Sequence, residues 1–230
     1  MRHFAPAWVY STCFALAAVA GYVNSLAWLG AQHKGISHVT GALTEAGVRV
    51  ASVGPRHASA SFVVLAAFAA GAVLSGLLIG DSTLRLGRRY GVGLLVESAL
   101  LVGAYFAGTH DRFVAADCLA AAACGLQNAL ATNFSGASIR TTHMTGVLTD
   151  LGLMLGQAIR LRRIDAWRFW LFATLLAGFF LGVVAGALAS AQLGHEALLV
   201  PAGALAAAAV AYWVWRQTGI ARGQASDGSL

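Results

Sequence analysis

Long apolar stretches alternate with short polar ones along the whole chain. Residues 4–32, 58–80, 169–194 and 197–215 contain no Asp, Glu, Lys or Arg, and residues 90–109 and 113–130 contain one acid each, Glu97 and Asp117. Each stretch approaches or exceeds the roughly 20 residues that an α-helix needs to cross a hydrocarbon core about 30 Å thick. Because backbone N–H and C=O groups find no water there, such stretches must be helical. The pattern predicts an all-α membrane protein with six transmembrane helices.

Two sequence motifs occur twice, in the same order. The segment 21–26, GYVNSL, returns as 125–130, GLQNAL, after a shift of 104 residues. The polar segment 38–47, HVTGALTEAG, returns as 143–152, HMTGVLTDLG, after a shift of 105 residues. A weaker third match pairs Ala70-Gly71 with Ala177-Gly178. We interpret the chain as a duplication.

The duplication divides one membrane domain, 1–230, into homologous halves at 8–108 and 112–216, followed by a polar tail at 217–230. Each half has a long helix, a short polar segment and two further long helices. Fourteen residues separate Lys34 from Arg49, about 21 Å of helix and short for a full crossing.

Both polar segments are therefore expected to be half-helices that enter and leave on one side. This makes the halves an inverted repeat, as in many transporters. With both termini cytoplasmic, this topology places eleven Lys and Arg residues inside and four outside, whereas a parallel repeat gives ten and five. The charge count favours the inverted repeat only slightly, and the parallel repeat stays open.

Composition agrees with a membrane protein and weighs against other classes. Hydrophobic residues make up 58% of the chain and charged residues 10%, whereas about a quarter of a soluble domain is charged. The net charge of +6 comes largely from Arg clusters such as 84–89 and 160–168, which are typical of cytoplasmic loops rather than of a nucleic-acid surface. The three cysteines lie in apolar stretches without C-x-x-C spacing and read as buried hydrophobes.

On a helix, each polar segment divides into an apolar face and a polar face. A face with hydroxyls, an imidazole and a carboxylate is costly in lipid, and a carboxylate there marks a functional site by default. We expect the two polar faces to meet inside the protein, beside amides of the preceding helices. The candidate substrate-binding residues are Asn24, His38, Thr40, Gly41, Thr44, Glu45, Gln127, Asn128, His143, Thr145, Gly146, Thr149 and Asp150.

These groups suit a small polar or anionic solute. The segments begin at Ser37 and at residues 141–142, where free N–H groups and a partial positive charge favour an anion. Glu45 and Asp150 suit a proton or a cation, and the nearby His residues suit proton relay. The alternative is structural, because Thr and Gly commonly serve helix packing in membranes. A zinc site shared by the halves is a weaker hypothesis, since neither segment pairs His and acid at i, i+3 or i, i+4; we predict no metal and no cofactor.

Residues 21–26, 37–47 and 125–152 resemble the YoaK family (domain of unknown function 1275), which consists of small bacterial integral membrane proteins. The resemblance extends over about residues 8–216. It implies a six-span protein of the bacterial inner membrane that is suspected of transport, and it supplies neither a substrate nor a residue role.

The expected function is a transporter or channel for a small polar or anionic solute, with proton coupling, acting between the two polar segments. Its expected partners are membrane lipid, the solute and further copies of the chain in a homo-oligomer, with no nucleic acid. One alternative is a non-transporting module that binds a partner protein or lipid. An intramembrane enzyme is the weakest alternative, because no nucleophile is identified beside His38 or His143; no catalytic residue is predicted.

Overall fold

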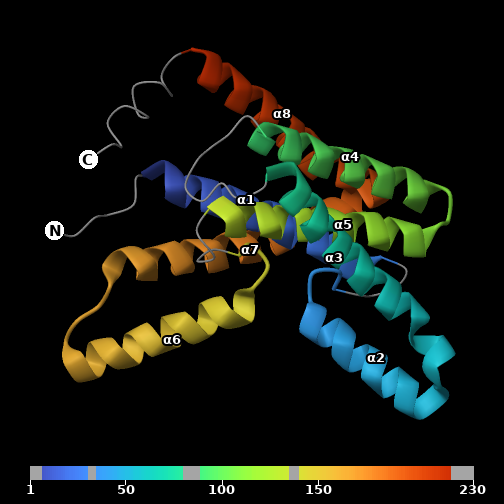
Figure 1. The fold of residues 1–230 in the computed structure, drawn as a ribbon, viewed down its shortest axis with the longest axis horizontal. Coiled ribbons are helices and arrows are strands. Elements are labelled where there is room, and N and C mark those ends of the chain that lie inside the picture. Colours follow the sequence, from blue (N-terminus) through green and yellow to red (C-terminus); the bar gives the residue numbers. More distant parts are fainter. Residues whose placement is uncertain (1–6, 31–34, 80–88, 135–139, 219–230) are drawn as a thin grey trace.

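The computed structural model describes residues 7–30, 35–79, 89–134 and 140–218, and all regular structure in these ranges is helical (Figure 1). The predicted all-α class is confirmed. The polar tail 217–230 is described as far as Thr218, and its remainder lies outside the described residues. The α-helices are α1 (Ala7–Leu29), α2 (Val39–Val53), α3 (Ser59–Ile79), α4 (Arg89–Thr109), α5 (Phe113–Phe134), α6 (Met144–Leu161), α7 (Ala166–Leu193) and α8 (Leu199–Gln217), with short 3-10 helices η1 (Pro55–Ala58) and η2 (Gly194–Leu198).

Five stretches of the described chain are long and apolar enough to cross a membrane: Ala7–Leu29, Pro55–Ile79, Arg89–Thr109, Phe113–Asn133 and Ala166–Gln217. The last stretch, of 52 residues, contains the two helices α7 and α8. They separate at Gly194, whose φ of 55° lies in the left-handed region that glycine tolerates. Pro201 lies in the first turn of α8, where its missing N–H costs no intrahelical hydrogen bond.

The helices α1, α3, α5 and α7 pack closely in two pairs. α1 lies along α7, and α5 lies along α3. A Cβ added at Gly21 of α1 would strike the Phe179 carbonyl of α7, and a Cβ at Gly125 of α5 would strike the Phe68 carbonyl of α3. Small residues allow this backbone approach, which membrane helices use because lipid gives little hydrophobic drive for association.

In each pair, the partner helix also places a glycine against the backbone of its neighbour. Gly71 of α3 abuts Ala122 of α5, and Gly182 of α7 abuts Ala18 of α1. Ala18 and Ala122 are 104 positions apart, as the repeat predicts, but Gly71 and Gly182 are 111 apart. The contacts therefore match FAAGAVLS (68–75) with FFLGVVAG (179–186). The weak match of Gly71 with Gly178 differs from this register by four residues, about one helical turn, although Gly178 itself also packs against α1 at Phe14.

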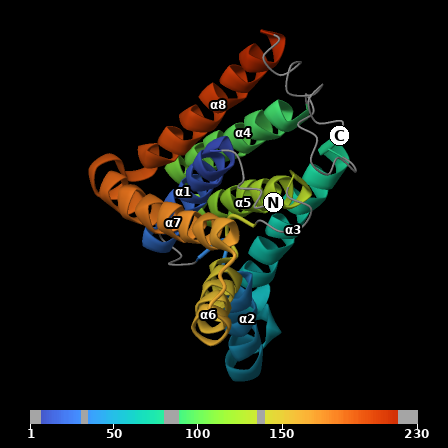
Figure 2. The ribbon, with the colours of Figure 1, turned by 90° about the vertical axis from the view of Figure 1, so that its left-hand side faces the viewer.

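The helices α2 and α6 stand away from the other helices, as Figure 1 and Figure 2 both show. α2 contacts η1 and α3, and α6 contacts α7, but no contact joins α2 to α6 within the described ranges. Val147 and Leu151 hold α6 against the start of α7 in a small apolar cluster. The expectation that the two polar faces meet across the halves is thus wrong for this structure.

Candidate functional site

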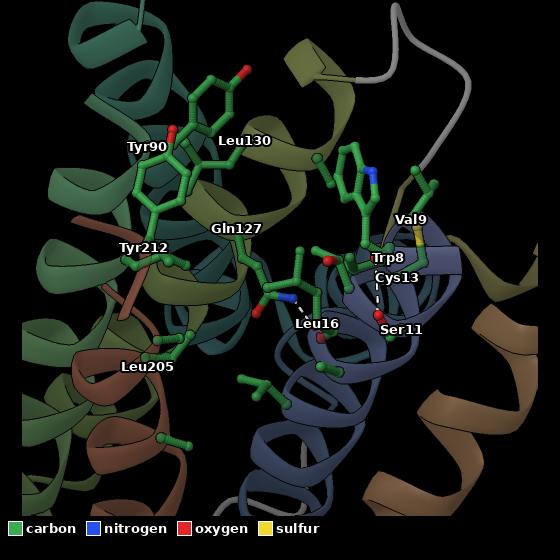
Figure 3. Close-up of a pocket in the computed structure, with 18 residues that line it drawn as sticks. Trp8, Val9, Ser11, Cys13, Leu16, Tyr90, Gln127, Leu130, Leu205 and Tyr212 are labelled. Atoms are coloured by element: carbon green, nitrogen blue, oxygen red, sulfur yellow. Dashed lines mark hydrogen bonds between the residues drawn. The ribbon is translucent and has the colours of Figure 1, made fainter. Parts of the chain in front are cut away.

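Two cavities lie at opposite ends of the helical core, and α1, α4 and α5 contribute to the lining of both. The first, cavity A, has a volume of about 480 Å³ and lies between the first part of α1, the start of α4 and the ends of α5 and α8. Figure 3 shows Tyr90, Tyr212 and Leu205 on one side of it, Trp8 and Leu16 on the other, and Gln127 between them. Most of its lining is aliphatic, so the few polar groups decide what the cavity accepts.

Two of these polar groups are almost completely buried. The Gln127 amide is 1% exposed and donates from Nε2 to the Leu16 carbonyl of α1 at 2.6 Å; its oxygen is directed away from that bond (Figure 3). The Thr141 side chain is 0% exposed, and its Oγ1 has no hydrogen-bond partner among the described residues. Buried hydroxyls are normally satisfied, so Thr141 leaves hydrogen-bonding capacity at the wall of cavity A.

The second, cavity B, has a volume of about 410 Å³ and lies at the other end of the core. Its lining comes from the end of α1, the end of α4, the start of α5, Ser190 near the end of α7 and the η2 turn. Asp117 and His195 contribute the ionisable groups. The ring of Phe113 stacks on His195, with centroids 6.4 Å apart and an interplanar angle of 27°.

The two cavities lie on one line through the core. On α4, Tyr90 and Leu94 line cavity A, whereas Ala104 and Gly108 line cavity B. Steps of three or four residues connect these positions through 97 and 101, so all of them share one face of the helix. Between the last position that lines cavity A and the first that lines cavity B, α1 advances four residues, from Val19 to Val23, and α4 advances ten, from Leu94 to Ala104. These intervals correspond to about 6 and 15 Å of helix.

A tightly packed layer, here called the plug, closes this interval. It consists of Glu97 and Leu101 of α4, Cys124 of α5 and Ala202 of α8, none of them more than 2% exposed. Ser98, next to Glu97, joins α4 to α8 by donating to the Ala202 carbonyl at 2.8 Å.

Glu97 is the polar exception within the plug. Its side chain is 1% exposed, and its Oε2 atom has no hydrogen-bond partner in the described ranges. Cys124 of α5 lies near Glu97 in this layer. Glu97 was recognisable in the sequence as a single acid within an apolar stretch, but its place between two cavities depends on which helix faces meet.

The thirteen predicted site residues do not form one site. One group lies at the end of α1, where the Asn24 amide oxygen accepts hydrogen bonds from the Ser37 hydroxyl at 3.0 Å and the Ser37 N–H at 3.4 Å, and lies 3.2 Å from Nδ1 of His38. Burial lowers the pKa of the His38 imidazole below its ordinary value. The second half repeats the arrangement, because Asn128 accepts from the Thr142 N–H at 3.3 Å. The N–H groups of Ser37 and Thr142, at two of the positions predicted to bind an anion, are therefore occupied by these amides.

The remaining polar residues of α2 and α6 satisfy themselves locally. The hydroxyls of Thr44 and Thr149 each donate to the carbonyl one turn earlier, of Thr40 and Thr145, at 2.9 Å. Glu45 forms an ion pair with Arg49 at 2.8 Å, and Asp150 is exposed. A Cβ added at Gly146 would strike the His143 ring, whereas a Cβ added at Gly41 would touch the Cβ of His38. Of the thirteen, Gln127 alone reaches a cavity.

Comparison with known proteins finds a family but no characterised relative. No curated protein and no solved structure matches the chain. The model of the family described as protein of unknown function (DUF1275) matches residues 12–211, nearly the whole of the helical region, which bears out the resemblance seen in the repeated motifs. This chain of apolar helices, with a cavity at each end of its core, belongs to the DUF1275 family.

Proposed function

We propose that the protein is a transporter or channel for a small polar or anionic solute, and that the solute passes through the α1–α4–α5–α8 core rather than between α2 and α6. The observation that carries this proposal is the pair of cavities at opposite ends of one core, separated by a single plug. Two access cavities separated by one closed layer are compatible with alternating exposure of a central site to the two sides of the membrane. The proposal assigns no catalytic residue, metal or cofactor.

The directions of the helices support an inverted repeat with six spans. α1 begins at cavity A and ends at cavity B, whereas its counterpart α5 begins at cavity B and ends at cavity A. α4 and α8 are opposed in the same way. The reciprocal glycine contacts between α1 and α7 and between α5 and α3 agree with two related halves. α2, with 15 residues, is about 22 Å long, too short for a full crossing.

The cationic residues support an orientation. Arg89 begins α4, Arg216 ends α8 and Arg140 follows α5, so all three belong to the cavity A end of the core. Positive charge gathers on the cytoplasmic side of membrane proteins. We therefore place cavity A at the cytoplasmic face of a bacterial inner membrane, with both termini inside and lipid around the helices.

The proposal can be tested before the solute is known. In a variant with Cys13, Cys118 and Cys124 replaced by Ala, single cysteines are introduced at Leu94 in cavity A and at Ala116 in cavity B, both partly exposed. A membrane-impermeant methanethiosulfonate reagent is then applied to one side of oriented vesicles at a time. Each cysteine is expected to react from one side only, and the two from opposite sides.

A cysteine at Leu77, which is 77% exposed on the outside of α3, serves as the lipid-facing control and should react from neither side. Reaction of both cavity cysteines from the same side, or of neither from any side, would contradict the pathway. Uptake of urea, acetate, glycine and phosphate into vesicles, read by light scattering, then narrows the solute class.

A non-transporting module is the second candidate, favoured by the separation of α2 and α6 from the core. Both helices expose large apolar side chains, among them Leu43, Leu148 and Ile159. Partner helices or further copies of the chain would cover these faces. This function predicts cross-links from α2 and α6 to another polypeptide in native membranes, together with the absence of cysteine labelling in both cavities.

A further inference from the structure

We propose that Glu97 carries the coupling proton of the pathway, binding it from water in cavity A and releasing it to water in cavity B. This inference rests on the proposed transport function and replaces Glu45 and Asp150, which the sequence favoured. Those two acids lie outside the core, one paired with Arg49 and one exposed. Glu97 lies between the cavities, where a change of its charge acts on the plug.

The position of Glu97 on α4 gives it access to cavity A. It lies one turn beyond Leu94, which lines that cavity, and two turns before Ala104, which lines the other. Side chains on a helix tilt toward its N-terminus, and the N-terminus of α4 is at cavity A. A small movement of the plug would therefore wet the carboxyl from cavity A first.

The packing around Glu97 suits the neutral acid and not the carboxylate. An ionised carboxylate without a partner is strongly disfavoured in a dry interior, and the plug residues around it are Leu, Cys and Ala. The neutral acid fits the closed plug, whereas the carboxylate requires water from one of the cavities. Protonation therefore favours closure, and release of the proton favours hydration and opening.

Apart from Cys124, the other ionisable groups near this pathway lie farther along the core. From α5, Cys124 is next to Glu97, and Asp117 lies in cavity B. From α1, the Tyr22 hydroxyl is occupied by donating to the Ala197 carbonyl at 3.1 Å. The η2 turn contributes His195 and Glu196 beyond the B end, and Tyr90, Tyr212 and Arg216 gather at the A end, whereas the described part of α3 has no ionisable side chain. The step is the simple addition of H⁺ to a carboxylate and its release.

The experiment uses the two cavity cysteines at Leu94 and Ala116 in full-length protein in vesicles. Their labelling rates are measured from pH 5.5 to pH 8.5, and the ratio of the two rates removes the ordinary pH dependence of thiol chemistry. In the Glu97 background the ratio should change with pH, because protonation shifts the plug. Glu97→Gln, which has the shape of the neutral acid and so preserves packing, should make the ratio independent of pH.

Glu97→Asp keeps a carboxyl and should keep the pH dependence, and Asp165→Asn at the exposed start of α7 is the matched acid control. A ratio that is flat in the Glu97 background, or that still changes in Glu97→Gln, overturns the inference. A ratio that becomes independent of pH in the double variant Glu45→Gln, Asp150→Asn also overturns the inference. If neither cysteine reacts at any pH, the transport pathway itself fails, which separates that outcome from failure of Glu97 alone.

Discussion

The close contact between the halves predicts a specific pattern of glycine sensitivity. At Gly71 and Gly182, an added Cβ would lie inside the 3.0 Å limit that real Cβ atoms respect, against backbone carbonyls of Ala122 and Ala18. Backbone cannot rotate away as a side chain can, so the helices must separate until the contact reaches at least 3.4 Å. Overpacking of this kind costs about 1–3 kcal/mol. For a chain of this length, that corresponds to a fall in melting temperature of about 2–12 °C.

Gly76, also on α3, is the matched control because a Cβ there would meet nothing within 4 Å. Gly76→Ala should leave the melting temperature in detergent unchanged or raise it, because Ala favours the helix over Gly by about 0.5–1 kcal/mol. Gly71→Ala and Gly182→Ala should fall by similar amounts, since their contacts are reciprocal. If either is as stable as Gly76→Ala in a fluorescence melting assay, the close approach on that side is absent from the native protein.

Three further predictions concern the asparagine hydrogen bonds at the helix ends, the hydrogen bond between α4 and α8, and the pH dependence of stability. Asn24→Ala and Asn128→Ala should each lower stability by about 1–3 kcal/mol, because buried donors lose their acceptor, and Asn24→Asp, which keeps the acceptor oxygens, should lose less in the same melting assay. Ser98→Ala should lower the free energy of unfolding by about 0.5–1.5 kcal/mol, whereas Ser52→Ala on the exposed side of α2 should lower it less. Equal effects would show that the α4–α8 hydrogen bond does not stabilise the protein. The lowered pKa of His38 means that folding favours its neutral imidazole. Its contribution to the free energy of unfolding is therefore complete above the ordinary histidine pKa, and it is lost as the pH falls through that value toward the pKa of His38 in the folded protein. His38→Gln should therefore make the melting temperature less dependent on pH between about 7 and 5, and an unchanged slope would contradict this.

The helices themselves could be predicted from the sequence. The uncharged stretch 58–80 became α3 at Ser59–Ile79, and the stretch 4–32 contains α1 at Ala7–Leu29. The prediction succeeds because a run of apolar residues of membrane length has one way to satisfy its backbone, within a single helix. The second polar segment is helical as predicted, but α6 begins at Met144 rather than at residues 141–142, and His143 is its N-cap residue.

The position of α2 and α6 could not be predicted in this way. The sequence argument assumed that a polar face must find partners across the protein. Instead, Glu45 finds Arg49 on the next turn, and the Thr44 hydroxyl uses the carbonyl of Thr40. Each of these partners is available in any isolated helix, so a polar face does not by itself imply a buried neighbour.

The residues that recur in both halves and the residues that line the path carry different information. The recurring Asn24 and Asn128 each tie the turn before a polar helix to the helix before it, and the paired glycines hold the halves together. Such contacts are needed twice because the scaffold has two halves. A group at the single crossing point of one path is needed once, so it has no reason to recur. Glu97, which the search for repeated motifs left aside, meets that description under the proposed pathway. If the pathway is as proposed, the single buried acid is a better guide to it than the two acids of the repeated segments.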